Sequence, residues 1–327
     1  MTTLDQFITA RNPDTRSNLK TLAVLIGLVV LAALLSQGVF LQPANLLNLL
    51  NQNTTLIIIA LGQLLVIITG GIDLSVGAVM AVTSVLVVLF QDIGLGGSFV
   101  VALAAAAVFG LVNGLLVTFV RLPAFVVTLA TLQIGYSVSK ILSDWGGSGG
   151  GTVYTGLQGA GLPGAFTAFY QTSFLGLPYP LLLCGLFLVL TALFMRTRTG
   201  FFLHSVGGNE RAARLSGVPV WLVKTSAYLL SALLAGLGGI LFVARVGLGD
   251  PQAGTWTALD SIAAVSIGGA SLSGGQGTVL GTLIGVVILS VLNNLMNLLG
   301  VPPTLQPAVK GLVILAAVYL NSARQRG

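Results

Sequence analysis

An aspartate inside an apolar region is the first feature of this chain that calls for chemistry. Asp73 stands in the stretch Gly-Gly-Ile-Asp-Leu-Ser-Val-Gly at 70–77, between apolar runs at 56–69 and 78–90. A carboxylate at the centre of a bilayer costs about 2.5–3.5 kcal/mol, so we expect Asp73 near an interface or facing a polar interior. Its position also predicts that it caps the following helix, because the helix N-terminus carries free N–H groups and a partial positive charge.

Small residues surround this aspartate, and they predict a break between two helices. Glycine permits close backbone approach and dihedral angles that other residues resist. We therefore expect residues 70–77, called here the first joint, to act as a helix joint or gate. Its candidate residues are Gly70, Gly71, Asp73, Ser75 and Gly77.

A second copy of this pattern stands near the C-terminus. Residues 268–275, called here the second joint, read Gly-Gly-Ala-Ser-Leu-Ser-Gly-Gly and match the first joint at five of eight positions. Its candidate gate residues are Gly268, Gly269, Ser273 and Gly275. Repeated halves with glycine-interrupted helices in corresponding places are typical of transporters. The alternative is a pair of ordinary tight turns.

Composition assigns the chain to the membrane. Its 327 residues are 55% hydrophobic and 7% charged, whereas soluble proteins carry about 25% charged residues. The only cysteine, Cys184, excludes an internal disulfide, and no spacing of Cys or His predicts a metal or haem site.

One pentapeptide, Leu-Ser-Gly-Gly-Gln at 272–276, matches the signature motif of ABC ATPases. An ATPase also needs a glycine-rich phosphate loop that ends in Gly-Lys, and no lysine of this chain follows a glycine. We therefore interpret the pentapeptide as coincidence and expect no ATP hydrolysis by this chain.

About 20 apolar residues cross a bilayer, and on this measure the chain holds about ten transmembrane helices in a single domain over 1–327. Lys and Arg mark the cytoplasmic ends of helices. Their positions predict that both termini, with residues 1–19 at the N-terminus, and both joints lie on the cytoplasmic side, which makes the repeat parallel. Residues 143–178 then lie outside, where they form either a docking surface or a plain linker. The eighth helix is the weakest, because it is short and contains Asp260, which either lines a path or caps the helix. The predicted helices are 20–40, 50–70, 73–91, 99–120, 124–142, 180–197, 221–244, 254–270, 278–298 and 306–321.

The connection over 197–220 differs from the others, because it contains a short charged helix. Asn209 has the residue type to cap this helix, Glu210 stands four residues before Arg214, and Gly217 with Pro219 ends it. We expect this cytoplasmic segment to contact a partner. The candidate residues are Asn209, Glu210, Arg211, Ala212, Arg214 and Leu215.

Polar residues within the predicted spans are candidates for a substrate path, where they would contact the polar groups of the transported molecule. The alternative is that they hydrogen-bond neighbouring helices. They are Gln63, Asn113, Thr131, Gln133, Asn293 and Asn294.

Four segments together resemble the ribose-type permeases of ABC importers: 70–77, 207–217, Leu-Asp-Ser-Ile-Ala-Ala-Val at 259–265, and 292–301 followed by Ala-Val-Lys-Gly at 308–311. The resemblance covers essentially the whole chain. It implies a permease dimer (two copies of this chain or a heterodimer) in the bacterial inner membrane, a periplasmic sugar-binding protein, and ATPase subunits that bind ATP and Mg²⁺ and receive the helix at 207–217. It also implies a monosaccharide substrate of the ribose type. It gives this chain no cofactor and no nucleic-acid partner.

A different class of protein remains open on the residues alone. Ten helices and broken repeats also suit a self-sufficient secondary transporter or channel for a small polar solute. The charged cytoplasmic helix favours the importer, because a secondary transporter has no ATPase to engage.

Overall fold

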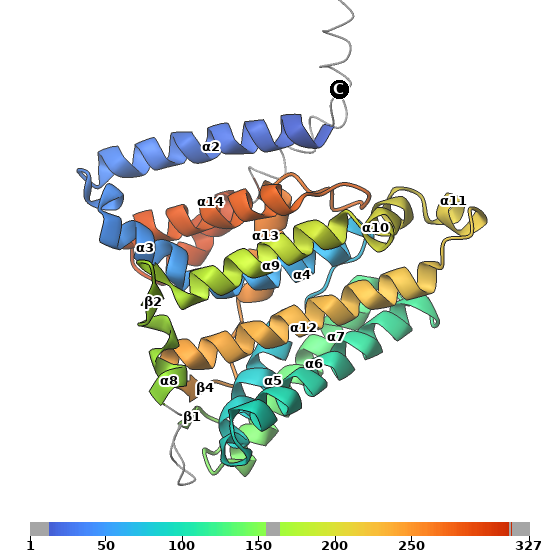
Figure 1. Cartoon of the computed structure of the whole chain (residues 1–327), viewed down its shortest axis with the longest axis horizontal. Helices are drawn as coiled ribbons and strands as arrows, with labels where there is room; N and C mark the ends of the chain where they lie inside the picture. The colour runs from blue at the N-terminus through green and yellow to red at the C-terminus, as the bar shows by residue number, and fades with distance from the viewer. Residues whose placement is uncertain (1–12, 155–163, 314, 316–327) are drawn as a thin grey trace, which may run out of the picture.

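The computed structural model describes residues 13–154, 164–313 and 315. The N-terminal segment 1–12 and residues 314 and 316–321 of the last predicted helix, 306–321, lie outside the described residues; within that helix the chain is helical over 306–313. The described part is built almost entirely of helices packed side by side (Figure 1). This confirms the all-α, polytopic fold expected from the composition.

The tenth predicted span is helical over 306–313, and the other nine correspond to helices with shifted bounds. They are α2 (Pro13–Leu35), α3 (Pro43–Gln52) with α4 (Thr54–Ile68), α5 (Val76–Leu89), α6 (Leu95–Thr118), α7 (Ala124–Trp145), α9 (Tyr179–Met195), α12 (Val220–Val246), α13 (Thr257–Ile267) and α14 (Val279–Leu298). The connection between α9 and α12 holds α10 (Arg198–Gly208) and α11 (Glu210–Leu215). Short 3₁₀ turns lie at Val39–Leu41 (η1), Gln91–Ile93 (η2) and Ala168–Tyr170 (η3).

Length separates these helices into two groups. In the described part, α6, α7, α12 and α14 are each long and apolar enough to cross a membrane, and two bent helix pairs raise the number to six. One such pair is α3 with α4, which bend by 45°. By contrast, α5 has 14 residues and α13 has 11, which is about 21 Å and about 16 Å of helix. Ten full helical spans therefore stay a prediction.

The two short helices are continued by non-helical backbone that enters the helix layer. Before α13, Gly254 lies against Gly77, so closely that a Cβ on either residue would clash with the backbone of the other. The carbonyl of Pro251 accepts from Ser139 Oγ at 2.9 Å. Irregular backbone at membrane depth is tolerated where protein groups satisfy it in this way. The predicted eighth helix, 254–270, is thus helical only over Thr257–Ile267, and the residues before and after that stretch form turns.

The two ends of the helix layer are distinct. Residues at the ends of α4 and α6 and at the starts of α7 and α12 line one cavity, and α11 projects at this end, which we call the α11 end (Figure 1). At the opposite end β1 (Val153–Tyr154) pairs antiparallel with β4 (Leu248–Gly249). The predicted outer connection also contains α8 (Gly164–Thr167) and a hairpin of β2 (Ser173–Phe174) with β3 (Leu177–Pro178). The described part of this connection is therefore structured, and the prediction of a plain linker is wrong for it.

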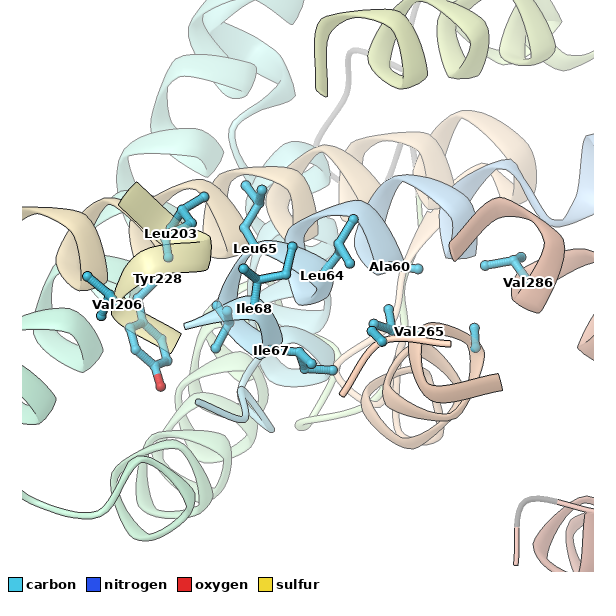
Figure 2. Packing of buried hydrophobic residues seen from close by; sticks show 14 of the residues in the cluster. Ala60, Leu64, Leu65, Ile67, Ile68, Leu203, Val206, Tyr228, Val265 and Val286 are labelled. Carbon is cyan, nitrogen blue, oxygen red and sulfur yellow. The ribbon is translucent and has the colours of Figure 1, made fainter. Parts of the chain in front are cut away.

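Helix α12 holds the layer together by packing on α4, α5 and α6. Its glycines allow this: a Cβ on Gly238 would come within 2.7 Å of Ile59 Cδ1. Close to the end of α4, buried apolar residues of α4, α10, α12 and α13 meet in one cluster (Figure 2). In that view Ile67 and Ile68 lie between Val206 of α10 and Val265 of α13.

Candidate functional site

The first joint contains a fully buried polar network centred on Asp73. Its Oδ1 accepts from the backbone N–H of Ser75 at 2.9 Å and from Ser75 Oγ at 2.6 Å, and its Oδ2 accepts from Ser231 Oγ at 3.0 Å. Asp73, Ser75 and Ser231 are each 0% exposed. Within the described residues, the carboxylate is thus satisfied by three donors rather than by a cation, which resolves how an acid is accommodated in an apolar region.

The network continues into α6 and α7. Asn113 Nδ2 donates to Ser75 Oγ at 2.8 Å, and Thr131 Oγ1 donates to Asn113 Oδ1 at 2.8 Å. The amide of Gln63, in the orientation that satisfies both of its groups, donates to the Asp73 carbonyl at 3.0 Å and accepts from the Asp73 N–H at 3.2 Å. Three of the six predicted path residues therefore lie in one cluster, where they hydrogen-bond neighbouring helices.

The other three predicted path residues lie elsewhere. Gln133 is exposed on α7. Asn294 of α14 exchanges two amide hydrogen bonds with Asn45 of α3, at 2.9 and 3.1 Å, and Asn293 is half-buried beside it. The alternative role, hydrogen bonding between neighbouring helices, thus describes Asn294.

The capping prediction for Asp73 is wrong in detail. Helix α5 begins at Val76 and its N-cap residue is Ser75, so 73–75 lie before the helix. Among backbone N–H groups of the described residues, the Asp73 carboxylate accepts only from that of Ser75, two residues further along the chain. Its role is to fix the turn that leads into α5 by joining it to Ser231 of α12.

The glycines of the first joint serve the two purposes expected of them. Gly70 has a φ of +79°, a region that strains other residues. A Cβ on Gly71 would clash with the Tyr228 hydroxyl. That hydroxyl is buried, has no partner among the described residues and borders the cavity at the α11 end, which measures about 600 Å³.

The two joints lie against each other. The N–H of Gly275 donates to the carbonyl of Ile68, the last residue of α4, at 2.8 Å. A Cβ on Gly274 would lie 2.9 Å from Gly70 Cα. Helices α4 and α13 therefore both end at this contact. The pentapeptide 272–276 belongs to this turn, where Ser271 N donates to Gln276 O at 3.0 Å.

The end of α10 packs into the contact between the joints. A Cβ on Gly207 would clash with the Ile68 carbonyl oxygen and would lie 2.5 Å from Gly275 N. His204 Nδ1 lies 3.1 Å from Gly275 O. We call the set of Ile68, Gly207 and Gly275 the glycine junction. Sequence analysis missed it, although Gly207 and Gly208 were part of a recognised motif, because the motif does not say what the glycines contact.

Helix α11 follows directly, and its internal features are confirmed. Asn209 Oδ1 accepts from Ala212 N at 2.9 Å, and Glu210 forms an ion pair with Arg214 at 2.9 Å. Glu210 also pairs with Lys224 of α12 at 2.6 Å, a contact that the sequence did not reveal. Gly217 ends the turn with a φ of +81°.

The outer face of α11 is free. Leu215 is 82% exposed and Arg211 is exposed, and Arg211 has no hydrogen bond or ion pair to any described residue. Helices below about 12 residues are marginal in water, so α11 depends on Ala213, which is buried, and on the Glu210–Lys224 pair for its position. Arginine is enriched among the residues that dominate protein–protein binding, so the exposed, unpaired Arg211 makes this face a candidate surface for a protein partner.

Glu210 makes the position of α11 sensitive to pH. The hydrogen bond from Lys224, with Arg214 nearby, holds the pKa of the Glu210 carboxyl below its ordinary value of 4.5, although partial burial opposes this. A lowered folded-state pKa contributes stability that is complete above the unfolded value and is lost as the pH falls through the folded one. We expect the protection factors of the α11 amides, which are corrected for the intrinsic pH dependence of exchange, to fall below about pH 4.5. Glu210→Gln should show low protection factors at pH 7 that do not change further on acidification.

The Asp73 network predicts a graded effect of substitution. Asp73→Asn keeps an acceptor for Ser75 and should retain most uptake, whereas Asp73→Leu leaves the buried groups of Ser75 and Ser231 without their partner, at about 1–3 kcal/mol for each. We expect a lower midpoint of thermal unfolding for Asp73→Leu in detergent. Equal loss of uptake in both variants at normal membrane levels would show that the charge itself is required.

Apolar helices long enough to cross a membrane, two short helices continued by non-helical chain, and glycine joints that meet at one end define a multi-pass membrane transport protein. The chain belongs to the family described as branched-chain amino acid transport system / permease component, which matches residues 45–318.

Curated relatives match over nearly their whole length. The chain is 41% identical to the Ribose import permease protein RbsC of Bacillus subtilis (strain 168), over 90% of this chain and 89% of that protein. It is 40% identical to the Ribose import permease protein RbsC of Escherichia coli (strain K12), over 98% and 99%. It is 32% identical to the Xylose transport system permease protein XylH of Haemophilus influenzae, over 94% and 98%. No solved structure matches.

These similarities make the chain a permease subunit of an ABC importer in the inner membrane, and not itself an enzyme. Within the described residues, no group of three or more His, Cys, Asp or Glu side chains gathers to hold a metal ion.

Proposed function

We propose that this permease carries a monosaccharide, a ribose-like pentose, across the inner membrane by alternating access. The observation that carries the proposal is the similarity to ribose import permeases over almost the full chain. The xylose permease, also named for a pentose, is similar at lower identity.

A separate ATPase subunit supplies the energy by binding ATP and Mg²⁺ and docking on α11. This proposal is supported by the exposed Leu215 and the unpaired Arg211 on that helix. A periplasmic sugar-binding protein delivers the substrate to the β1–β4 end. A second permease subunit, a further copy of this chain, completes the path across the membrane lipid. The chain itself needs no cofactor and no nucleic acid.

Movement of α11 would pass to both joints through the glycine junction. Only Asn209 separates α10 from α11, and Gly207 is in van der Waals contact with the carbonyl of Ile68 and the N–H of Gly275. A displacement of α10 must therefore shift the end of α4 and the start of the second joint together. Packed contacts of this kind change between discrete arrangements rather than deform continuously.

Co-purification tests the importer assignment. We expect the tagged permease, solubilised in mild detergent, to retain an ATP-binding subunit, and we expect ATP hydrolysis to belong to that subunit. Recovery of the permease alone, active in sugar uptake without ATP, would instead establish a secondary transporter.

The orientation in the membrane is a further expected outcome. With the α11 end and the termini in the cytoplasm, an impermeant thiol reagent should label Leu175→Cys but not Leu215→Cys in intact cells, in a background that replaces Cys184. Both leucines are exposed in the permease, at 87% and 82%, and accessibility is matched in cells that lack the ATPase subunit, which would otherwise cover Leu215. The reverse labelling pattern would invert the topology.

A further inference from the structure

We propose that a cavity between the start of α13 and the helical segment 306–313 is a binding subsite for the transported sugar. The cavity measures about 310 Å³ and is lined by Trp256, Asp260, Gln306 and Lys310 together with leucine, proline and glycine residues. Small-molecule sites begin at about 300 Å³, so a single sugar ring is a suitable occupant. This inference rests on the proposed monosaccharide substrate.

The cavity contains an ion pair within a predicted membrane span. Lys310 Nζ donates to Asp260 Oδ2 at 3.2 Å, and both side chains are only 20% exposed. Ionisable residues inside a membrane are costly, and they face cavities and mark substrate pathways. The pair also favours the path-lining role of Asp260 over the helix-capping role. Its carboxylate bonds Lys310, and among the described residues no side chain caps the start of α13.

The place of the cavity in the fold is that of a transporter site. Helix α13 begins inside the helix layer, since Thr257 Oγ1 lies 3.9 Å from Met80 Sδ in the second turn of α5. Discontinuous helices that begin or end within the membrane form substrate sites in transporters. Here Trp256 is the N-cap residue of such a helix and Asp260 lies in its first turn.

The chemistry of the lining selects a neutral polyhydroxylated ring. Asp260 and Lys310 cancel in charge, so neither an anion nor a cation is favoured, yet the carboxylate keeps free acceptor sites and the ammonium keeps free donors. Gln306 uses its Nε2 on Asn297 Oδ1 and Val301 O, which leaves its oxygen as an acceptor. Sugar hydroxyls donate and accept, and therefore match all three side chains.

Trp256 supplies the apolar part of the site. Its side chain is 59% exposed, so the indole is open to a ligand. An aromatic face carries negative potential and packs against the C–H groups of a sugar ring. Because the cavity is open, binding should be weak, in the millimolar range, as suits a site that the sugar must leave.

Intrinsic fluorescence tests this directly, because the chain has three tryptophans, Trp145, Trp221 and Trp256. In the purified permease with Trp145→Phe and Trp221→Phe, D-ribose should cause a saturable fluorescence change below about 100 mM. The matched control retains only Trp145, which is 73% exposed at the end of α7, and should show no saturable change. Glycerol at the same concentrations should have no effect on either protein.

Uptake provides the second measurement. Trp256→Ala should lower the maximal rate at least fivefold, and Trp256→Phe should stay within twofold of wild type, with the half-saturating concentration unchanged because the binding protein sets it. If wild type takes up ribose while the Trp256-only protein shows no saturable change, or Trp256→Ala matches wild type, the subsite is wrong and the proposed function stands. If wild type takes up no monosaccharide, the proposed function itself fails.

Discussion

Replacing Gly207 by alanine is expected to abolish sugar uptake, whereas Gly208→Ala should leave uptake near the wild-type rate. A methyl group at Gly207 would overlap the Ile68 carbonyl oxygen and crowd the N–H of Gly275. A methyl group at Gly208 would have no neighbouring atom within 4 Å. Both glycines are the last residues of α10, so the gain in helix propensity is similar. The two variants differ mainly in the glycine junction.

The measurement is uptake of radiolabelled ribose by cells with matched membrane levels of the two variants. Co-purification of the ATPase subunit serves as the control for folding, because α11 itself is unchanged. Wild-type uptake by Gly207→Ala would contradict the proposal that α10 transmits movement to both joints.

The second large effect is expected on α11. Arg211→Glu with Leu215→Asp should reduce the recovery of the ATPase subunit more than tenfold and abolish uptake with it. Within the described residues, Arg211 forms no hydrogen bond or ion pair, and Leu215 is 82% exposed. Neither change therefore disturbs the internal contacts of the permease. Arg214 is a poorer target than the sequence implied, because its substitution would also break the ion pair with Glu210.

Arg196→Glu is the matched control for charge. Arg196 is also exposed and lies at the end of α9, on the same side of the helix layer but outside α11. The control variant should retain its ATPase subunit. Full recovery of the ATPase with the double variant would show that α11 is not the docking surface and that its arginine serves only topology or lipid contact.

The sequence predicted local features well, because they depend on residues close together in the chain. The cap at Asn209 and the pair of Glu210 with Arg214 follow from spacing on one helix. The positive φ of Gly70 is one that glycine adopts readily. Apolar length likewise located the long helices α6, α7, α12 and α14.

What the sequence could not predict depends on contacts between distant segments. The bond of Asp73 to Ser231 and the clash that a side chain at Gly207 would cause involve residues far apart in the chain. The bounds of α13 were also missed at both ends, because residues 254–256 and 268–269, which the sequence predicted as helix, form turns. Hydropathy reports burial, and it does not distinguish helix from buried extended chain.

Reconstitution into liposomes tests the central claim most directly. The purified chain, its ATPase subunit and the sugar-binding protein would be assembled with ATP and Mg²⁺ on the α11 side, and entry of radiolabelled ribose would be measured. We predict uptake that requires all three proteins and ATP, and that unlabelled ribose suppresses but leucine does not. Uptake of ribose by this chain alone, without ATP, would contradict the account, as would ATP-driven uptake of leucine in place of ribose.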